Sequence, residues 1–134
     1  MHPRTPVAAG LDTFFVVLFV AIGRREHDQD PAISGLITTA APFLIALAVA
    51  WVVLRAWRHP TAWRTGVGIW AIVIALGMVL RNLVFDDGTA ASFVVVATLF
   101  VGLFLVGWRI AWRLVEGRVR DRAAPSIPTS PSSR

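Results

Sequence analysis

The chain has 134 residues, of which 56% are apolar and 16% charged, and its mean hydropathy is +0.67. A soluble domain of this size needs more polar surface, whereas uninterrupted apolar runs near 20 residues are typical of membrane spans. The absence of cysteine excludes disulfides, thiolate metal sites and cysteine nucleophiles. All 13 basic residues are arginine. Because these arginines flank the apolar segments, they indicate membrane topology rather than nucleic-acid binding.

Four apolar segments predict an all-α integral membrane four-helix bundle with up-down topology. The helices are expected at about 6–23, 31–55, 65–85 and 89–112. They form one domain over 1–122, and a disordered Pro/Ser-rich cytoplasmic tail is expected over 123–134. The first segment is the least regular, because its uncharged part, Thr13–Gly23, is too short to cross a hydrocarbon core of ~30 Å. The first helix must therefore include Asp12.

The distribution of arginines predicts that both termini are cytoplasmic. In this orientation ten of the thirteen arginines lie inside, and only Arg24, Arg25 and Arg81 lie outside. The six tryptophans agree, because all of them fall at the cytoplasmic ends of the predicted spans or within a turn or two of these ends. We therefore expect a multi-pass protein of the cell (inner or plasma) membrane.

Asp12 is the most informative charged residue, since a carboxylate within a span usually faces the bundle interior and is either paired or functional. At its depth the expected partner is Arg109, at the cytoplasmic end of the fourth segment. Two roles stay open. The pair can fix the first and last helices together, or Asp12 can be a protonatable carboxyl coupled to transport.

A second group of polar residues is predicted near the outer ends of the helices. Pro42 interrupts the second segment and frees the carbonyl of Thr38, which needs a partner inside a membrane. Arg81 can join this group, or it can pair structurally with an aspartate of the neighbouring outer loop. Together with the inner pair, the candidate polar or transport site comprises Asp12, Arg24, His27, Thr38, Thr39, Pro42, Arg81, Asn82, Ser92 and Arg109.

Catalytic, metal and cofactor sites are not expected. His27 lies among acidic residues, but their spacing matches no metal motif, and an exposed acidic turn accounts for them. The chain contains none of the common hydrolase, phosphate-loop or dinucleotide motifs. Two pairs of small residues, Ala46 with Ala50 and Ala71 with Ala75, favour close helix packing, either within the bundle or between copies.

Several short motifs are similar to those of a known family. They are an aspartate opening the first helix, the turn Gly23–His27, the stretch Thr39–Phe43, the step Leu80-Arg81, the pair Ser92-Phe93 and the pair Trp108-Arg109. Over about residues 11–113 the chain resembles the Domain of Unknown Function 3054 family, small four-helix integral membrane proteins of bacteria and archaea. The resemblance implies this architecture but no substrate, cofactor or mechanism. It also directs attention to Asp12, Arg24, His27, Pro42, Arg81, Ser92 and Arg109.

The first functional hypothesis is an oligomeric transporter or channel for a small solute or ion, with Asp12 as a cytoplasmic-side gate or proton site. The alternative is an accessory or assembly subunit that docks on a larger membrane complex, in which every charged residue is structural. An intramembrane enzyme ranks third, because no nucleophile and base pair can be found. The expected partners are the lipid bilayer and either a second copy or another membrane protein, and not nucleic acid.

Overall fold

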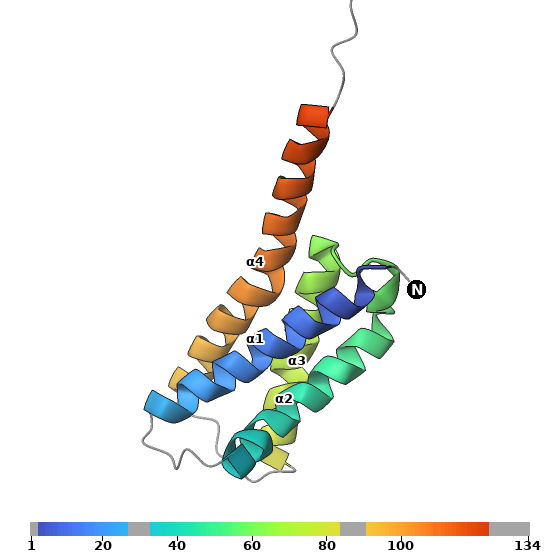
Figure 1. The fold of residues 1–134 in the computed structure, drawn as a ribbon. Coiled ribbons are helices and arrows are strands. Elements are labelled where there is room, and N and C mark those ends of the chain that lie inside the picture. Colours follow the sequence, from blue (N-terminus) through green and yellow to red (C-terminus); the bar gives the residue numbers. More distant parts are fainter. Residues whose placement is uncertain (1–2, 27–32, 84–90, 124–134) are drawn as a thin grey trace, which may run out of the picture.

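The structure is a computed structural model that describes residues 3–26, 33–83 and 91–123. Its elements are α1 (Thr5–Glu26), α2 (Ile33–Val53), the short 3-10 helix η1 (Ala56–Arg58), α3 (Trp63–Leu83) and α4 (Ala91–Ala123). The four long helices pack side by side as a bundle, and the described residues contain no strand (Figure 1). The predicted all-α four-helix fold is thereby confirmed.

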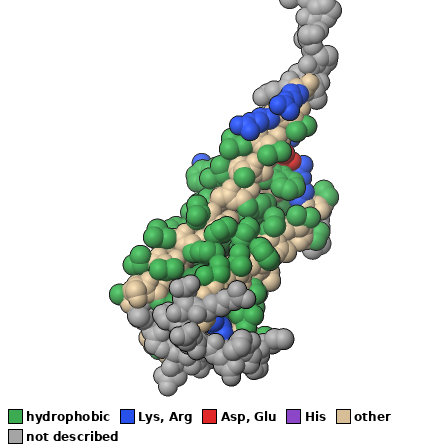
Figure 2. Space-filling view, turned by 60° about the vertical axis from the view of Figure 1, so that its left-hand side comes forward, with side chains coloured by type: hydrophobic (Ala, Val, Ile, Leu, Met, Phe, Trp, Pro, Cys, Tyr) green, Lys and Arg blue, Asp and Glu red, His purple; other side chains and the backbone are tan. Residues whose placement is uncertain are grey.

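All four helices are long and apolar enough to cross a membrane. Large apolar side chains stay exposed around the bundle, among them Leu83 (77% exposed), Leu103 (69%) and Leu99 (68%). Figure 2 shows such side chains covering the middle of the visible face, whereas arginine side chains gather on the projecting end of α4. Exposure of this apolar surface to water is unfavourable in free energy, whereas contact with lipid tails is not. The bundle is therefore a membrane domain.

The bundle interior is filled by apolar side chains from all four helices. Phe43, Ile69 and Leu105 are completely buried, and the ring of Phe43 meets that of Phe19 edge to face, with 6.0 Å between the ring centroids. Among neighbouring helices, α2 and α3 share the most extensive interface and α1 and α4 the least extensive. Ala46 and Ala50 are buried on α2, where their small side chains permit this close approach.

The connection between α2 and α3 is well defined. Arg55 follows the last turn of α2 with φ of 48°, a left-handed conformation that is uncommon for a residue with a side chain. The short helix η1 comes next, and Pro60 after it is fully buried. The hydroxyl of Thr5 donates to the Trp57 carbonyl oxygen at 3.3 Å, which ties the start of α1 to this connection.

The helix α4 continues past Trp112, where the predicted fourth span ends. Its 33 residues correspond to about 50 Å, more than the ~30 Å of a hydrocarbon core. Hydropathy detects only the apolar part of a helix, whereas arginine, leucine and glutamate beyond it also favour helix formation. Figure 1 shows α4 projecting well beyond the other helices. The disordered tail is predicted over 123–134; Ala123 is the last residue of α4, and the rest of the predicted tail lies outside the described residues.

The start of α1, the α2–α3 connection and the C-terminal end of α4 lie at the same end of the bundle, called here the arginine-rich end (Figure 1). Arg55, Arg58, Arg64 and Arg113 are exposed there. The excess of arginine predicts that this end faces the cytoplasm.

Single cysteines test this orientation, because the chain has no cysteine of its own. A membrane-impermeant maleimide should label Gly88→Cys, between α3 and α4, in intact cells. Arg58→Cys and Arg122→Cys should react only after permeabilisation. The reverse pattern would contradict the predicted orientation.

Candidate functional site

Asp12 lies inside the bundle with no exposed surface, and each of its carboxylate oxygens accepts two hydrogen bonds. Oδ1 accepts from Arg109 Nη1 at 2.8 Å and from the indole Nε1 of Trp108 at 3.0 Å. Oδ2 accepts from Arg109 Nη2 at 2.7 Å and from Trp51 Nε1 at 3.0 Å. A carboxylate has about four lone-pair positions, so Asp12 has no acceptor capacity left for a ligand.

Arg109 is also fully buried, and its guanidinium makes further hydrogen bonds within the protein. Nε donates to the carbonyl oxygen of Pro60 at 2.9 Å, and Nη1 donates to that of Leu105 at 2.7 Å. The guanidinium carbon lies 4.5 Å from the centre of the Trp108 ring, within cation–π range. Charged partners, short bonds and exclusion of water make this a strong bidentate ion pair.

These residues, Asp12, Trp51, Pro60, Trp108 and Arg109, form what we call the charge cluster. They come from α1, α2, the α2–α3 connection and α4. The helix α3 joins through Gly66, because a Cβ atom there would lie 2.7 Å from Cδ of Arg109 and 3.0 Å from the Leu105 carbonyl oxygen. The absence of a side chain at Gly66 lets α3 approach the arginine. The cluster thus joins all four helices at one depth.

The predicted pairing of Asp12 with Arg109 is confirmed by this geometry. Sequence reasoning missed the roles of Trp51, Trp108 and Pro60. It places the two tryptophans only in the aromatic belt at the cytoplasmic ends of the helices. The two tryptophans lie at nearly the depth of Asp12, and a buried indole N–H needs an acceptor. This depth could have indicated that they donate to the Asp12 carboxylate.

The predicted outer group is only partly brought together. Nη1 of Arg24 donates to the Thr39 hydroxyl oxygen at 2.9 Å, and this hydroxyl donates to the Gly35 carbonyl oxygen at 2.9 Å. The guanidinium of Arg81 lies 4.7 Å from the ring centre of Phe93, in cation–π geometry. Arg24 thus joins α1 to α2, and Arg81 joins α3 to α4.

The other candidates have different surroundings. Pro42 is buried inside α2, whereas Thr38, Asn82 and Ser92 are exposed. His27 lies outside the described residues. The groove found at this end, of about 300 Å³, is mainly apolar and is lined by Phe19, Ile22, Gly23, Ser92, Phe93, Val96 and Phe100. The polar outer vestibule stays a prediction.

The described residues offer no group of histidines and acids that could hold a metal ion. The acceptor positions of Asp12 are filled from within the protein, so the geometry of the charge cluster supports cohesion of the helices rather than ligand binding. A transport role for Asp12 and Arg81 stays a prediction. It would require Asp12→Asn and Arg81→Ala to abolish flux without lowering the yield of folded protein.

Removal of one charge of the Asp12–Arg109 pair should lower the free energy of unfolding strongly. Asp12→Asn leaves the Arg109 guanidinium buried without a counter-charge, and we expect the free energy of unfolding to fall by roughly 3–5 kcal/mol. Asp12→Asn combined with Arg109→Met removes the stranded charge and should cost less than Asp12→Asn alone. Thermal unfolding in detergent, followed by tryptophan fluorescence, measures both changes.

A matched control for this experiment is Glu116→Gln, which breaks the half-exposed ion pair between Arg4 and Glu116. Exposed pairs contribute about 0–1 kcal/mol, so this variant should unfold close to the wild type. Equal stability of Asp12→Asn and the wild type would contradict a structural role for the cluster.

Gly66→Ala tests the close approach of α3 to Arg109. The added Cβ must displace Arg109 or separate α3 from α4, and we expect a loss of about 1–3 kcal/mol, typical of overpacking. Gly10→Ala is the control, because no heavy atom lies within 4 Å of the position that its Cβ would take. The same unfolding measurement should show Gly10→Ala to be neutral or slightly stabilising, and a similar result for Gly66→Ala would argue against the tight contact.

Comparison with known proteins gives one match. Neither the curated proteins nor the solved structures contain a match to this chain. Residues 9–112 match the family described as a protein of unknown function, DUF3054. The matched range includes Asp12, Trp51, Trp108 and Arg109, and thus every side chain that forms the hydrogen bonds to Asp12. The chain belongs to the DUF3054 family.

Proposed function

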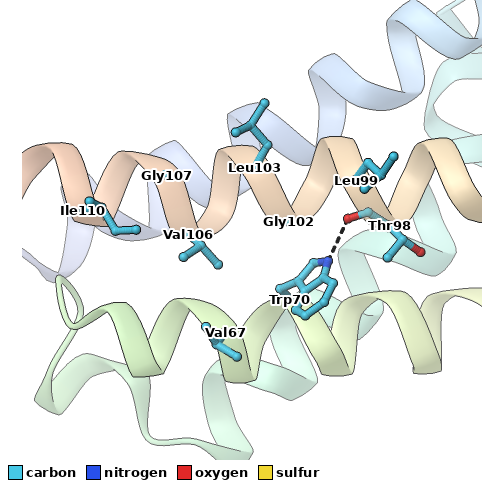
Figure 3. A pocket seen from close by; sticks show the side chains of 9 residues that line it. All are labelled: Val67, Trp70, Thr98, Leu99, Gly102, Leu103, Val106, Gly107 and Ile110. Atoms are coloured by element: carbon cyan, nitrogen blue, oxygen red, sulfur yellow. Dashed lines mark hydrogen bonds between the residues drawn. The ribbon is translucent and has the colours of Figure 1, made fainter.

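We propose that this protein is an accessory or assembly subunit of the cell (inner or plasma) membrane that receives a transmembrane helix of a larger complex between α3 and α4. The observation that carries the proposal is an apolar groove of about 500 Å³ along these two helices. Its lining includes Val67, Trp70, Gly102, Leu103, Gly107 and Ile110 (Figure 3).

The walls of this groove are firmly held. The indole N–H of Trp70 donates to the Thr98 carbonyl oxygen at 2.9 Å, as Figure 3 shows, and its ring lies against Gly102. Gly107 has no heavy atom within 4 Å of the position that a Cβ would take, so the groove is open above it. The open space above Gly107 lets the backbone of another helix approach closely, which is how membrane helices gain packing energy.

Two alanines follow Val67, which lines the groove, at intervals of four residues along α3. Ala71 and Ala75 are exposed, unlike the buried Ala46 and Ala50 of α2. The two small-residue pairs therefore have different surroundings, one inside the bundle and one facing the membrane. Small side chains beside an apolar groove favour a helix as the occupant.

The interior of the described bundle favours this proposal over a pathway through a single chain. Its centre is occupied by buried apolar side chains such as Phe43 and Ile69, and the acceptor positions of Asp12 are already used. The oligomeric transporter or channel stays a prediction. Its pathway would run between copies rather than through one bundle.

Site-specific photocrosslinking tests the proposed docking. A benzophenone amino acid at Leu103, in the groove, should crosslink in native membranes to a discrete membrane polypeptide other than the protein itself. The same amino acid at Val52, which is 64% exposed on α2, should give no such product. Mass spectrometry of the crosslinked band identifies the partner.

Two matched glycine variants control for effects on the fold. Gly107→Phe fills the groove and should abolish the Leu103 crosslink, whereas Gly10→Phe on α1 should leave it intact, since both positions have open space around them. Crosslinks only between copies would favour the oligomeric transporter. A crosslink that persists in Gly107→Phe would contradict docking in this groove.

A further inference from the structure

We propose that a second groove, between α1 and α4 at the arginine-rich end, binds an anionic phospholipid. The groove measures about 350 Å³ and is lined by Leu11, Trp108, Ala111, Trp112, Val115 and Glu116. It lies along the least extensive of the interfaces between neighbouring helices. Its walls are apolar except at Glu116, and they suit an acyl chain.

The depth of this groove matches the lipid–water boundary. Leu11 is adjacent in sequence to Asp12 and lies seven positions after Arg4, which corresponds to about 10 Å along the helix axis. Two tryptophans, Trp108 and Trp112, line the groove, and tryptophan is enriched at this level of a membrane because its ring is apolar and its N–H is polar. A lipid seated here places its glycerol and phosphate groups near Arg4.

The polar end of the groove contains a cation and a donor. The guanidinium of Arg4 lies 5.7 Å from the ring centre of Trp112 and forms an ion pair with Glu116. The Nε1 atom of Trp112 is buried and has no hydrogen-bond acceptor among the described residues. A turn of the Trp112 ring toward the groove that it lines would bring this N–H to an ester or phosphate oxygen of a lipid, and an unsatisfied buried N–H favours such a movement.

Charge complementarity favours an anionic headgroup. Arg113, Arg118, Arg120 and Arg122 are exposed on the C-terminal part of α4. Arginine side chains gather on the projecting end of this helix (Figure 2). Between Arg113 and Arg122 the sequence contains only two acidic residues, Glu116 and Asp121. Arginines clustered next to a span attract anionic lipids. The groove would thus hold the chain of one lipid while the surrounding arginines select its headgroup.

Native mass spectrometry of the full chain, released from detergent, tests the proposal with phosphatidylglycerol and phosphatidylcholine of identical acyl chains. We expect at least threefold tighter binding of phosphatidylglycerol. Ala111→Phe fills the groove from an exposed position and should weaken this binding at least threefold. Ala48→Phe, at an exposed position of α2, should leave it unchanged.

Two further variants separate lipid binding from a structural role. Arg4→Gln and Glu116→Gln both break the same ion pair. If the pair only stabilises the fold, the two variants behave alike. If the groove binds an anionic lipid, Arg4→Gln weakens phosphatidylglycerol binding at least threefold, and Glu116→Gln preserves or strengthens it.

Equal binding of the two lipids, or wild-type binding by Ala111→Phe, would overturn the proposal. This result is independent of the crosslinking at Leu103, because the two grooves lie on different helix pairs.

Discussion

The buried ion pair between Asp12 and Arg109 is the constraint on which the rest of the structure depends. Two opposite charges with no exposed surface are tolerated in a membrane only when each is fully hydrogen-bonded. This requirement fixes the orientation of Trp51 and Trp108 and the position of the Pro60 carbonyl, and it leaves no room for a side chain at Gly66. One electrostatic demand thereby sets how the four helices approach each other at that depth.

The buried ion pair also bears on where a ligand or partner could bind. The described interior is occupied by apolar side chains and by the Asp12–Arg109 ion pair. Polar groups that could meet a ligand therefore lie at the ends of the bundle, and the grooves that could hold a partner lie on its sides. The α3–α4 groove is apolar and is open above Gly107, whereas the α1–α4 groove lies beside Arg4. These two environments suit different occupants, a helix in the first and a charged lipid in the second.

The sequence was sufficient for the fold class and for the central pair. Run lengths and arginine positions predict the four helices, and depth along the helices pairs Asp12 with Arg109. The position of a residue along a helix gives its depth but not the direction in which its side chain faces. Trp51 and Trp108 could therefore be assigned to the aromatic belt, but their hydrogen bonds to Asp12 could not be predicted. Pro60 lies in the connection between α2 and α3. Hydropathy locates the helices but does not predict the path of such a connection, so the contact of its carbonyl with Arg109 was not expected. Whether outer polar residues such as Thr38, Arg81 and Ser92 meet likewise depends on helix rotation, which spacing does not give.

The separation of the two charges has a consequence for biosynthesis. Asp12 lies in the first helix and Arg109 in the last, 97 residues apart in sequence. When the first helix leaves the ribosome, its carboxylate has no partner from the last helix, and an unpaired aspartate within a span is unfavourable. The ion pair that stabilises Asp12 therefore forms only after the fourth helix has been synthesised. A chain truncated before Arg109 cannot form the charge cluster.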